Sequence, residues 1–283
     1  MTASPTFLLF VYCLAIAGVS LVGGLLPNWV QMTHTRTQLV MSFVSGLMLG
    51  VAFYHLLPHS VAMAEGSGAV DIAVWWLMIG LIAMLLLLRL FHFHQHDFSA
   101  EEDRHHDHHH HAPQGAAHRL SWLGIALGLA LHTLIDGVAL GAVMQGDAVR
   151  GGAAGLLGIG VFLAILLHKP LDAMSITTLM DAGGWSRSAR ATINLLFALM
   201  CPLGALLFFF GVDLLVDTRN HVVCAALAFS AGAFICIALS DLLPEVQFHS
   251  HDRTKLTLAF LLGIGLAYGM GGLEPAGIHL SGH

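Results

Sequence analysis

Two pairs of side chains in this sequence could together bind a metal ion. Residues 131–142 read LHTLIDGVALGA and place His132 and Asp136 four positions apart in an apolar stretch. Residues 167–174 read LHKPLDAM and repeat the spacing with His168 and Asp172. Positions four apart lie on one face of a helix. Two imidazole nitrogens and two carboxylate oxygens are suitable ligands for a divalent transition metal such as Zn²⁺.

The apolar surroundings make it energetically costly to keep these carboxylates charged, which strengthens the prediction of a bound metal ion. A charged side chain at the centre of a bilayer costs roughly 2.5–3.5 kcal/mol even on lenient insertion scales. A cation must offset that cost, and a bound metal would do so. The alternative is a buried structural contact, in which Lys169 pairs with Asp136 or Asp172. Pro170 follows Lys169 and is expected to kink or open its helix, as in many transporter sites.

The elements that position these residues are predicted to be membrane-spanning helices. The chain has 283 residues, of which 57% are hydrophobic and only 10% charged. Soluble domains carry about 25% charged residues, and a spanning helix needs about 20 mostly apolar residues. We therefore predict an all-α polytopic membrane protein, a single domain over residues 1–283. Its eight predicted spans are residues 6–26, 38–58, 70–91, 119–144, 152–180, 190–213, 221–244 and 255–273.

The distribution of Lys and Arg predicts the orientation of these spans. With eight spans, both termini lie on one side of the membrane. The loops on the other side carry eight Lys or Arg residues, and the loops on the side of the termini carry two. Since cytoplasmic loops are enriched in Lys and Arg, we predict that both termini face outward. The compactness of the chain favours a bacterial inner membrane.

The cytoplasmic loop at residues 92–118 is rich in histidine. Its low complexity cannot build a core, and its imidazoles suit transition metals. We interpret it as a flexible metal trap; a linker that binds metal only incidentally is the alternative. The histidines of its densest run are His105, His106, His108, His109, His110 and His111. The net charge of −6 and the lack of a basic surface exclude a nucleic-acid partner.

Two spans resemble each other at an offset of 186 residues. Residues 42–59 read SFVSGLMLGVAFYHLLPH, and residues 228–245 read AFSAGAFICIALSDLLPE. The spans are five apart and cross the membrane in opposite directions, which predicts an inverted repeat of spans 1–3 and 6–8 around spans 4 and 5. The repeat puts His55 and His59 near the outer mouth and Asp241 and Glu245 near the inner mouth. A path for a cation would look like this, although residues beside a helix-end proline can also be simply interfacial.

These motifs resemble those of the Zrt/Irt-like (ZIP) family of metal-ion transporters. The resemblance covers nearly the whole chain, with eight spans, outward termini and a His-rich loop after span 3. Its most specific motif is HTLIDGVALGA, similar to the family's His-x-x-x-Asp/Glu-Gly signature. The stretches LHKPLDA, FYHLLPH and ALSDLLPE are also similar to the family's. Many members carry a His-Glu-x-Pro-His-Glu pattern in span 5, where this chain has Lys169 and Pro170 after His168.

The resemblance implies a function and a mechanism. It implies import of Zn²⁺, and also of Fe²⁺, Mn²⁺ or Cd²⁺, by a homodimer that moves a four-helix unit against a scaffold, with no organic cofactor and no enzymatic activity. The metal would bind His132, Asp136, His168 and Asp172. A positive charge at Lys169 would repel a second cation, so we expect one central metal.

Two other functions remain open at this stage. An intramembrane zinc hydrolase would need a bound water and a general acid or base. A metal exporter of another fold is the other alternative. The direction of metal movement separates an exporter from an importer, and lipid cleavage would identify a hydrolase.

Overall fold

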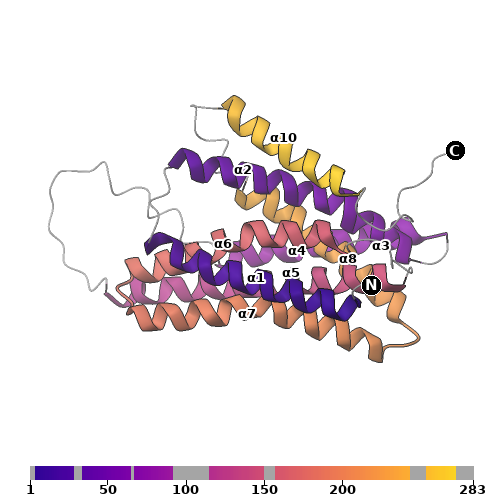
Figure 1. Cartoon of the computed structure of the whole chain (residues 1–283), viewed down its shortest axis with the longest axis horizontal. Helices are drawn as coiled ribbons and strands as arrows, with labels where there is room; N and C mark the ends of the chain where they lie inside the picture. Colours follow the sequence, from indigo (N-terminus) through magenta and orange to yellow (C-terminus); the bar gives the residue numbers. More distant parts are fainter. Residues whose placement is uncertain are drawn as a thin grey trace.

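The computed structural model describes residues 4–28, 34–64, 67–91, 115–149, 157–242 and 253–271. These residues form helices that run side by side along the long axis of the molecule (Figure 1). The helices are α1 (Pro5–Leu25), α2 (His34–Val51), α3 (Leu57–Met63), α4 (Ala69–Phe91), α5 (Gly115–Val149), α6 (Ile159–Ala182), α7 (Arg187–Gly211), α8 (Arg219–Ile237) and α10 (Arg253–Met270). Short turns are the 3₁₀ turns η1 (Leu26–Asn28) and η4 (Val212–Leu214) and the π-helical turns η2 (Ala52–Leu56) and η5 (Ala238–Leu242).

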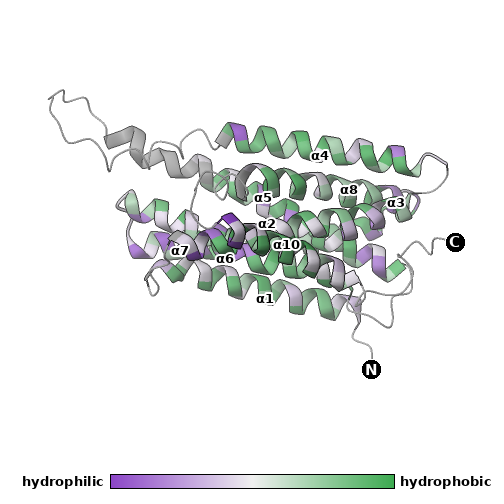
Figure 2. Ribbon diagram, turned by 90° about the horizontal axis from the view of Figure 1, so that it is seen from above, coloured by the Kyte–Doolittle hydropathy of each residue, from purple (hydrophilic) through white to green (hydrophobic). Residues whose placement is uncertain are grey.

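The described helices confirm the predicted all-α membrane architecture. Seven helical segments are long and apolar enough to cross a membrane. The eighth predicted span forms α10, whose 18 residues include Arg253 and Lys255 in the first turn, which lowers its mean hydropathy. Apolar residues cover most of α4 at the periphery (Figure 2). Such an exposed apolar surface fits contact with lipid.

The ends of the helices follow from local sequence signals. Ser4 caps α1, with its hydroxyl accepting from the Phe7 amide at 3.2 Å and Pro5 in the first turn. Ser186 caps α7 in the same way. Gly158 precedes α6 with a φ of +62°, a left-handed conformation that favours glycine. α6 is assigned as one helix through Pro170, so the helix is not opened at this proline.

The helices form two bundles, defined by their most extensive contacts. The first bundle contains α1, α5, α6 and α7, and the second contains α2, α3, α4, α8 and α10. α5 packs along α7 and α1 along α6 in the first bundle, while α2 packs along α10 and α4 along α8 in the second. We call the end of the molecule where α6 ends and α7 begins the Arg187 end, and the opposite end the His59 end.

The predicted inverted repeat is visible in the backbone. Both π-helical turns occur at the same place in the repeat, since η5 begins and ends 186 residues after η2. Close glycine contacts repeat as well. Gly46 lies against the carbonyl of Phe260, and its equivalent Gly232 lies against the carbonyl of Leu77. Gly263 meets the carbonyl of Phe43, as Gly80 meets that of Phe229, so the two repeats share one packing scheme.

Candidate metal centre

The two His–Asp pairs meet at the contact between α5 and α6. His132 and Asp136 lie on α5, and His168 and Asp172 lie on α6. One ligand atom from each lies within 4.8 Å of the others. His132, Asp136 and His168 are buried, and the Asp172 side chain is 16% exposed. Helical spacing therefore put each pair on one face, and helix packing brought the two faces together.

The distances between the ligand atoms suit a single tetrahedral ion. Asp136 Oδ2 lies 3.4 Å from His132 Nε2 and 3.2 Å from His168 Nε2. Asp172 Oδ2 lies 3.7 Å from His132 Nε2 and 3.8 Å from His168 Nε2. Zinc bonds of about 2.0–2.1 Å to N and O give tetrahedral edges of about 3.3–3.5 Å. The four His–Asp distances therefore lie within about half an ångström of such edges, and all four ligand atoms lie within 4.8 Å of one another.

A backbone hydrogen bond sets the orientation of His168. Its Nδ1 lies 2.8 Å from the carbonyl oxygen of Ala164, which can only accept, so Nδ1 carries the proton. In the neutral ring, Nε2 then presents a lone pair toward the carboxylates. Nε2 lies 3.2 Å from Asp136 Oδ2, close enough for one cation to bind both atoms. This is the arrangement of a histidine that binds metal through Nε2.

Lys169 contacts both carboxylates of the site. Its Nζ lies 2.5 Å from Asp136 Oδ2, 2.9 Å from Asp172 Oδ2 and 3.0 Å from Thr133 Oγ1, which uses all three of its donors. The structural contact considered as an alternative is therefore present, and it coexists with the metal-ligand geometry. Two carboxylates and one ammonium leave one net negative charge, which favours a single divalent cation.

Two buried atoms of the site have no hydrogen-bond partner among the described residues. They are His132 Nδ1 and Asp136 Oδ1. Buried polar atoms are nearly always paired, so unpaired atoms indicate that a ligand or water belongs nearby. A cavity of about 20 Å³ adjoins His132, His168 and Asp172, enough for one water or one small ion. It lies between the two bundles and toward the Arg187 end, where Gly128 and Leu129 precede His132.

The predicted outer-mouth histidines are buried in a hydrogen-bonded network. His55 Nε2 lies 2.7 Å from the Ala267 carbonyl oxygen. His59 Nε2 lies 2.9 Å from Asp147 Oδ1, while Asp147 Oδ2 accepts from the Gly158 amide at 2.9 Å. His59 is on α3 in the second bundle, and Asp147 is on α5 in the first. The network therefore joins the bundles at the His59 end.

Other predicted site residues lie outside the described part of the chain. These are Glu245 and the loop histidines His105, His106, His108, His109, His110 and His111, while Asp241 is described only in its backbone, within η5.

Sequence reasoning missed two residues that the structure brings to these networks. Thr133 accepts from Lys169, and Asp147 pairs with His59. Thr133 follows His132 directly and is unremarkable in sequence. Asp147 could have been noticed, since it is an isolated acid at the end of α5, which extends past the predicted end of span 4 at residue 144.

Comparison with known proteins finds similar sequences over most of the chain. Residues 91–271 match the family described as "ZIP Zinc transporter". "Zinc transporter ZIP9-B" of Xenopus laevis is 27% identical over 92% of this chain and 89% of its own length. "Zinc transporter ZIP9" of Xenopus tropicalis is 26% identical over 81% of this chain and 82% of its own length. The family match covers more than half of the chain and includes both site helices, so this protein belongs to the ZIP family of zinc transporters.

Proposed function

We propose that this protein imports zinc into the cytoplasm by binding one ion at His132, Asp136, His168 and Asp172. The observation that carries the proposal is the cluster of four ligand atoms between α5 and α6, which lie within 4.8 Å of one another. Membership of the zinc transporter family supports zinc as cargo. Fe²⁺, Mn²⁺ and Cd²⁺ have ligand preferences that overlap with this N/O set and are further candidate cargoes.

Lys169 makes the site mononuclear in this proposal. A second cation beside Asp136 and Asp172 would have to approach the ammonium, which already holds Oδ2 of both. A carboxylate oxygen has two lone pairs, so Oδ2 can keep Lys169 and bind zinc at once. Because zinc binds neutral imidazole and ionised carboxylate, protons compete with it, and acid should weaken binding.

Transport would proceed by movement of the first bundle against the second. The two bundles and the inverted repeat support this elevator-like scheme. With both termini outside, the Arg187 end faces the cytoplasm. The cavity at the metal site lies toward that end, and the His59–Asp147 pair closes the other, which supports release of zinc toward the Arg187 end. Zinc would come in past His55 and His59 once this closure opens, and leave past Asp241 and Glu245.

The remaining features of the protein belong to the same proposal. The His-rich loop would capture released zinc, and two copies would form a homodimer. The compact chain favours a bacterial inner membrane, although the matched relatives are frog proteins. Family membership supports a carrier over the intramembrane hydrolase considered above.

Zinc uptake into liposomes tests the proposal directly. Purified protein is reconstituted in liposomes that contain a zinc-sensitive dye, and wild type is compared with Asp136→Ala. The wild type should admit zinc, and the variant should lose nearly all uptake, because it lacks the ligand atom nearest to both imidazoles. Lys255→Ala, far from the site in sequence and on the exposed start of α10, is the control and should transport like wild type. Equal uptake by wild type and Asp136→Ala would contradict the proposed path.

Zinc sensitivity of cells and zinc binding by the purified protein distinguish the importer from the exporter and the hydrolase. Cells that make an importer should become sensitive to added zinc, while cells that make an exporter should become resistant. Zinc bound at one site without transport, together with cleaved lipid, would favour the hydrolase.

A further inference from the structure

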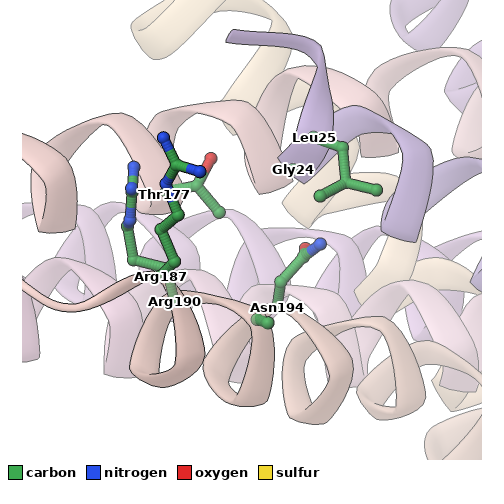
Figure 3. Close-up of a pocket in the computed structure, with 7 residues that line it drawn as sticks. Gly24, Leu25, Thr177, Arg187, Arg190 and Asn194 are labelled. Atoms are coloured by element: carbon green, nitrogen blue, oxygen red, sulfur yellow. The ribbon is translucent and has the colours of Figure 1, made fainter. Parts of the chain in front are cut away.

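A second cavity lies at the Arg187 end, away from the metal centre. It has a volume of about 540 Å³ and lies between α1, α6 and α7, all in the first bundle. Figure 3 shows Gly24 and Leu25 of α1, Thr177 of α6, and Arg187, Arg190 and Asn194 of α7 around it. None of these residues takes part in the proposed zinc path.

The cavity carries an excess of positive charge. Arg187 is exposed and pairs with no carboxylate of the described residues. Arg190 Nη1 lies 2.7 Å from Asp181 Oδ1, but its Nε is buried and has no hydrogen-bond partner in the described structure. The cavity wall therefore carries two guanidinium groups, and only that of Arg190 is paired with a carboxylate. Planar guanidinium groups bind phosphate through paired N–H donors, so an anion with several oxygens fits this wall.

A buried polar side chain also points to a ligand. Asn194 is only 4% exposed and lines the cavity. Its Nδ2 donates to the Leu21 carbonyl at 3.0 Å, while its buried Oδ1 has no partner among the described residues. That oxygen can accept from a hydroxyl or amine group. A phosphate beside a hydroxyl or amine is the chemistry of a phospholipid headgroup.

The apolar surface next to the cavity indicates a lipid rather than a soluble phosphate. Arg187 and Ala191 line the cavity, and Leu195 and Leu199 continue the same face of α7 at steps of four residues. Both leucines are 48% exposed on a membrane-spanning helix. A ligand with its phosphate on Arg187 could thus lay its acyl chains along Leu195 and Leu199.

We propose that this cavity binds the phosphate headgroup of an anionic phospholipid, held by Arg187 and Arg190, with Asn194 accepting from the rest of the headgroup. Basic pockets between spanning helices bind such headgroups at the cytoplasmic surface. Lipid binding at this site requires no transport activity, so it can be tested independently of the proposed zinc function. Its position on α6 and α7 ties the first bundle to the headgroup layer.

Native mass spectrometry of the detergent-purified full chain tests the site. Phosphatidylglycerol and phosphatidylcholine with identical acyl chains are titrated against wild type, Arg187→Gln, and the double variant Arg187→Gln/Arg190→Gln. Each arginine lost should weaken phosphatidylglycerol binding by about fivefold, with little change for phosphatidylcholine. The matched control is Arg36→Gln/Arg253→Gln, which removes two exposed charges from the same end in the second bundle and should bind like wild type.

Several outcomes would overturn the proposal. Equal loss of phosphatidylglycerol in both double variants would mean nonspecific attraction to surface charge. Binding of inorganic phosphate or glycerol phosphate as tight as that of phosphatidylglycerol would assign the cavity to a soluble phosphate. If the double variant fails to fold, the single variant Arg187→Gln still tests the site, because the Arg187 side chain is exposed and its replacement should not disturb folding. Wild-type lipid binding by a folded Arg187→Gln protein would exclude the site.

Discussion

At the scale of single residues, the metal centre depends on how each polar atom is satisfied in the absence of zinc. Ala164 fixes the ring of His168, and Lys169 supplies the only cation of the described residues that holds both site carboxylates. Without it, the buried Asp136 and the largely buried Asp172 would have no counter-charge, which is strongly unfavourable. In the proposed function, Lys169 would serve as a counter-ion that keeps the site stable when no zinc is bound.

Replacing Lys169 tests this counter-ion role. Lys169→Met should destabilise the zinc-free protein by about 3–5 kcal/mol, because it leaves the buried Asp136 and the largely buried Asp172 without a counter-charge. Added zinc should raise the melting temperature of the variant more than that of wild type. The measurement is thermal unfolding in detergent, with chelator and then with zinc.

A second variant serves as the control for this prediction. Lys169→Met/Asp172→Asn removes one negative charge together with the positive one, and should recover part of the lost stability. Identical melting of wild type and Lys169→Met in chelator would rule out the counter-ion role.

At the scale of helices, close backbone contacts hold the repeat together. Gly46 of α2 meets α10 at Phe260, and Gly232 of α8 meets α4 at Leu77, both at a backbone carbonyl that cannot move without its helix. Small residues permit such close packing between membrane helices. The two contacts are equivalent by the repeat, so they should be equally sensitive to added volume.

Alanine variants at these glycines test whether the two repeats pack equivalently. Gly46→Ala and Gly232→Ala should each lower stability by about 1–3 kcal/mol, since the new methyl group forces the helices apart. Gly18→Ala in α1 has open space around it and should be neutral or slightly stabilising. Thermal unfolding of the three variants checks this. Unequal costs at Gly46 and Gly232 would argue against equivalent packing in the two repeats.

At the scale of the whole molecule, transport by relative movement requires that contacts between the bundles break. The His59–Asp147 pair is such a contact, since it joins α3 of the second bundle to α5 of the first. The contact between Ser60 and Cys224, with Oγ and Sγ 3.4 Å apart, lies within the second bundle and need not change. His59 of α3 thus links the two bundles, while its neighbour Ser60 makes a contact within the second bundle.

Cross-linking distinguishes these two links. In a Cys224→Ser background, His59→Cys/Asp147→Cys treated with a short thiol-specific cross-linker should lose zinc uptake and regain it after cleavage of the linker. Zinc binding from the Arg187 end should persist, because the site itself remains intact. Uptake by reconstituted liposomes and zinc binding are measured on the same sample.

The control uses the contact inside the second bundle. Ser60→Cys paired with native Cys224 should tolerate the same cross-linker without loss of uptake. If cross-linked His59→Cys/Asp147→Cys protein still transported zinc at the uncross-linked rate, movement of one bundle against the other would be excluded.

The sequence by itself determined the membrane-spanning helices and the pairing of ligands within each site helix. Hydrophobic length specifies a span, and a spacing of four places His132 with Asp136 and His168 with Asp172, because both depend only on local helix geometry. The offset of 186 residues between Ala52–Leu56 and Ala238–Leu242 was also readable, since the two repeats kept similar residues at the same turn.

Only the tertiary structure decided what these groups contact across helices. It brought Lys169 onto both carboxylates, buried His59 against Asp147, and opened the arginine-lined cavity between α1, α6 and α7. It also kept α6 continuous through Pro170, where Gly23 of α1 packs closely on the proline backbone. These contacts join residues that are far apart in the chain, and their distances are set by the packing of whole helices rather than by local spacing.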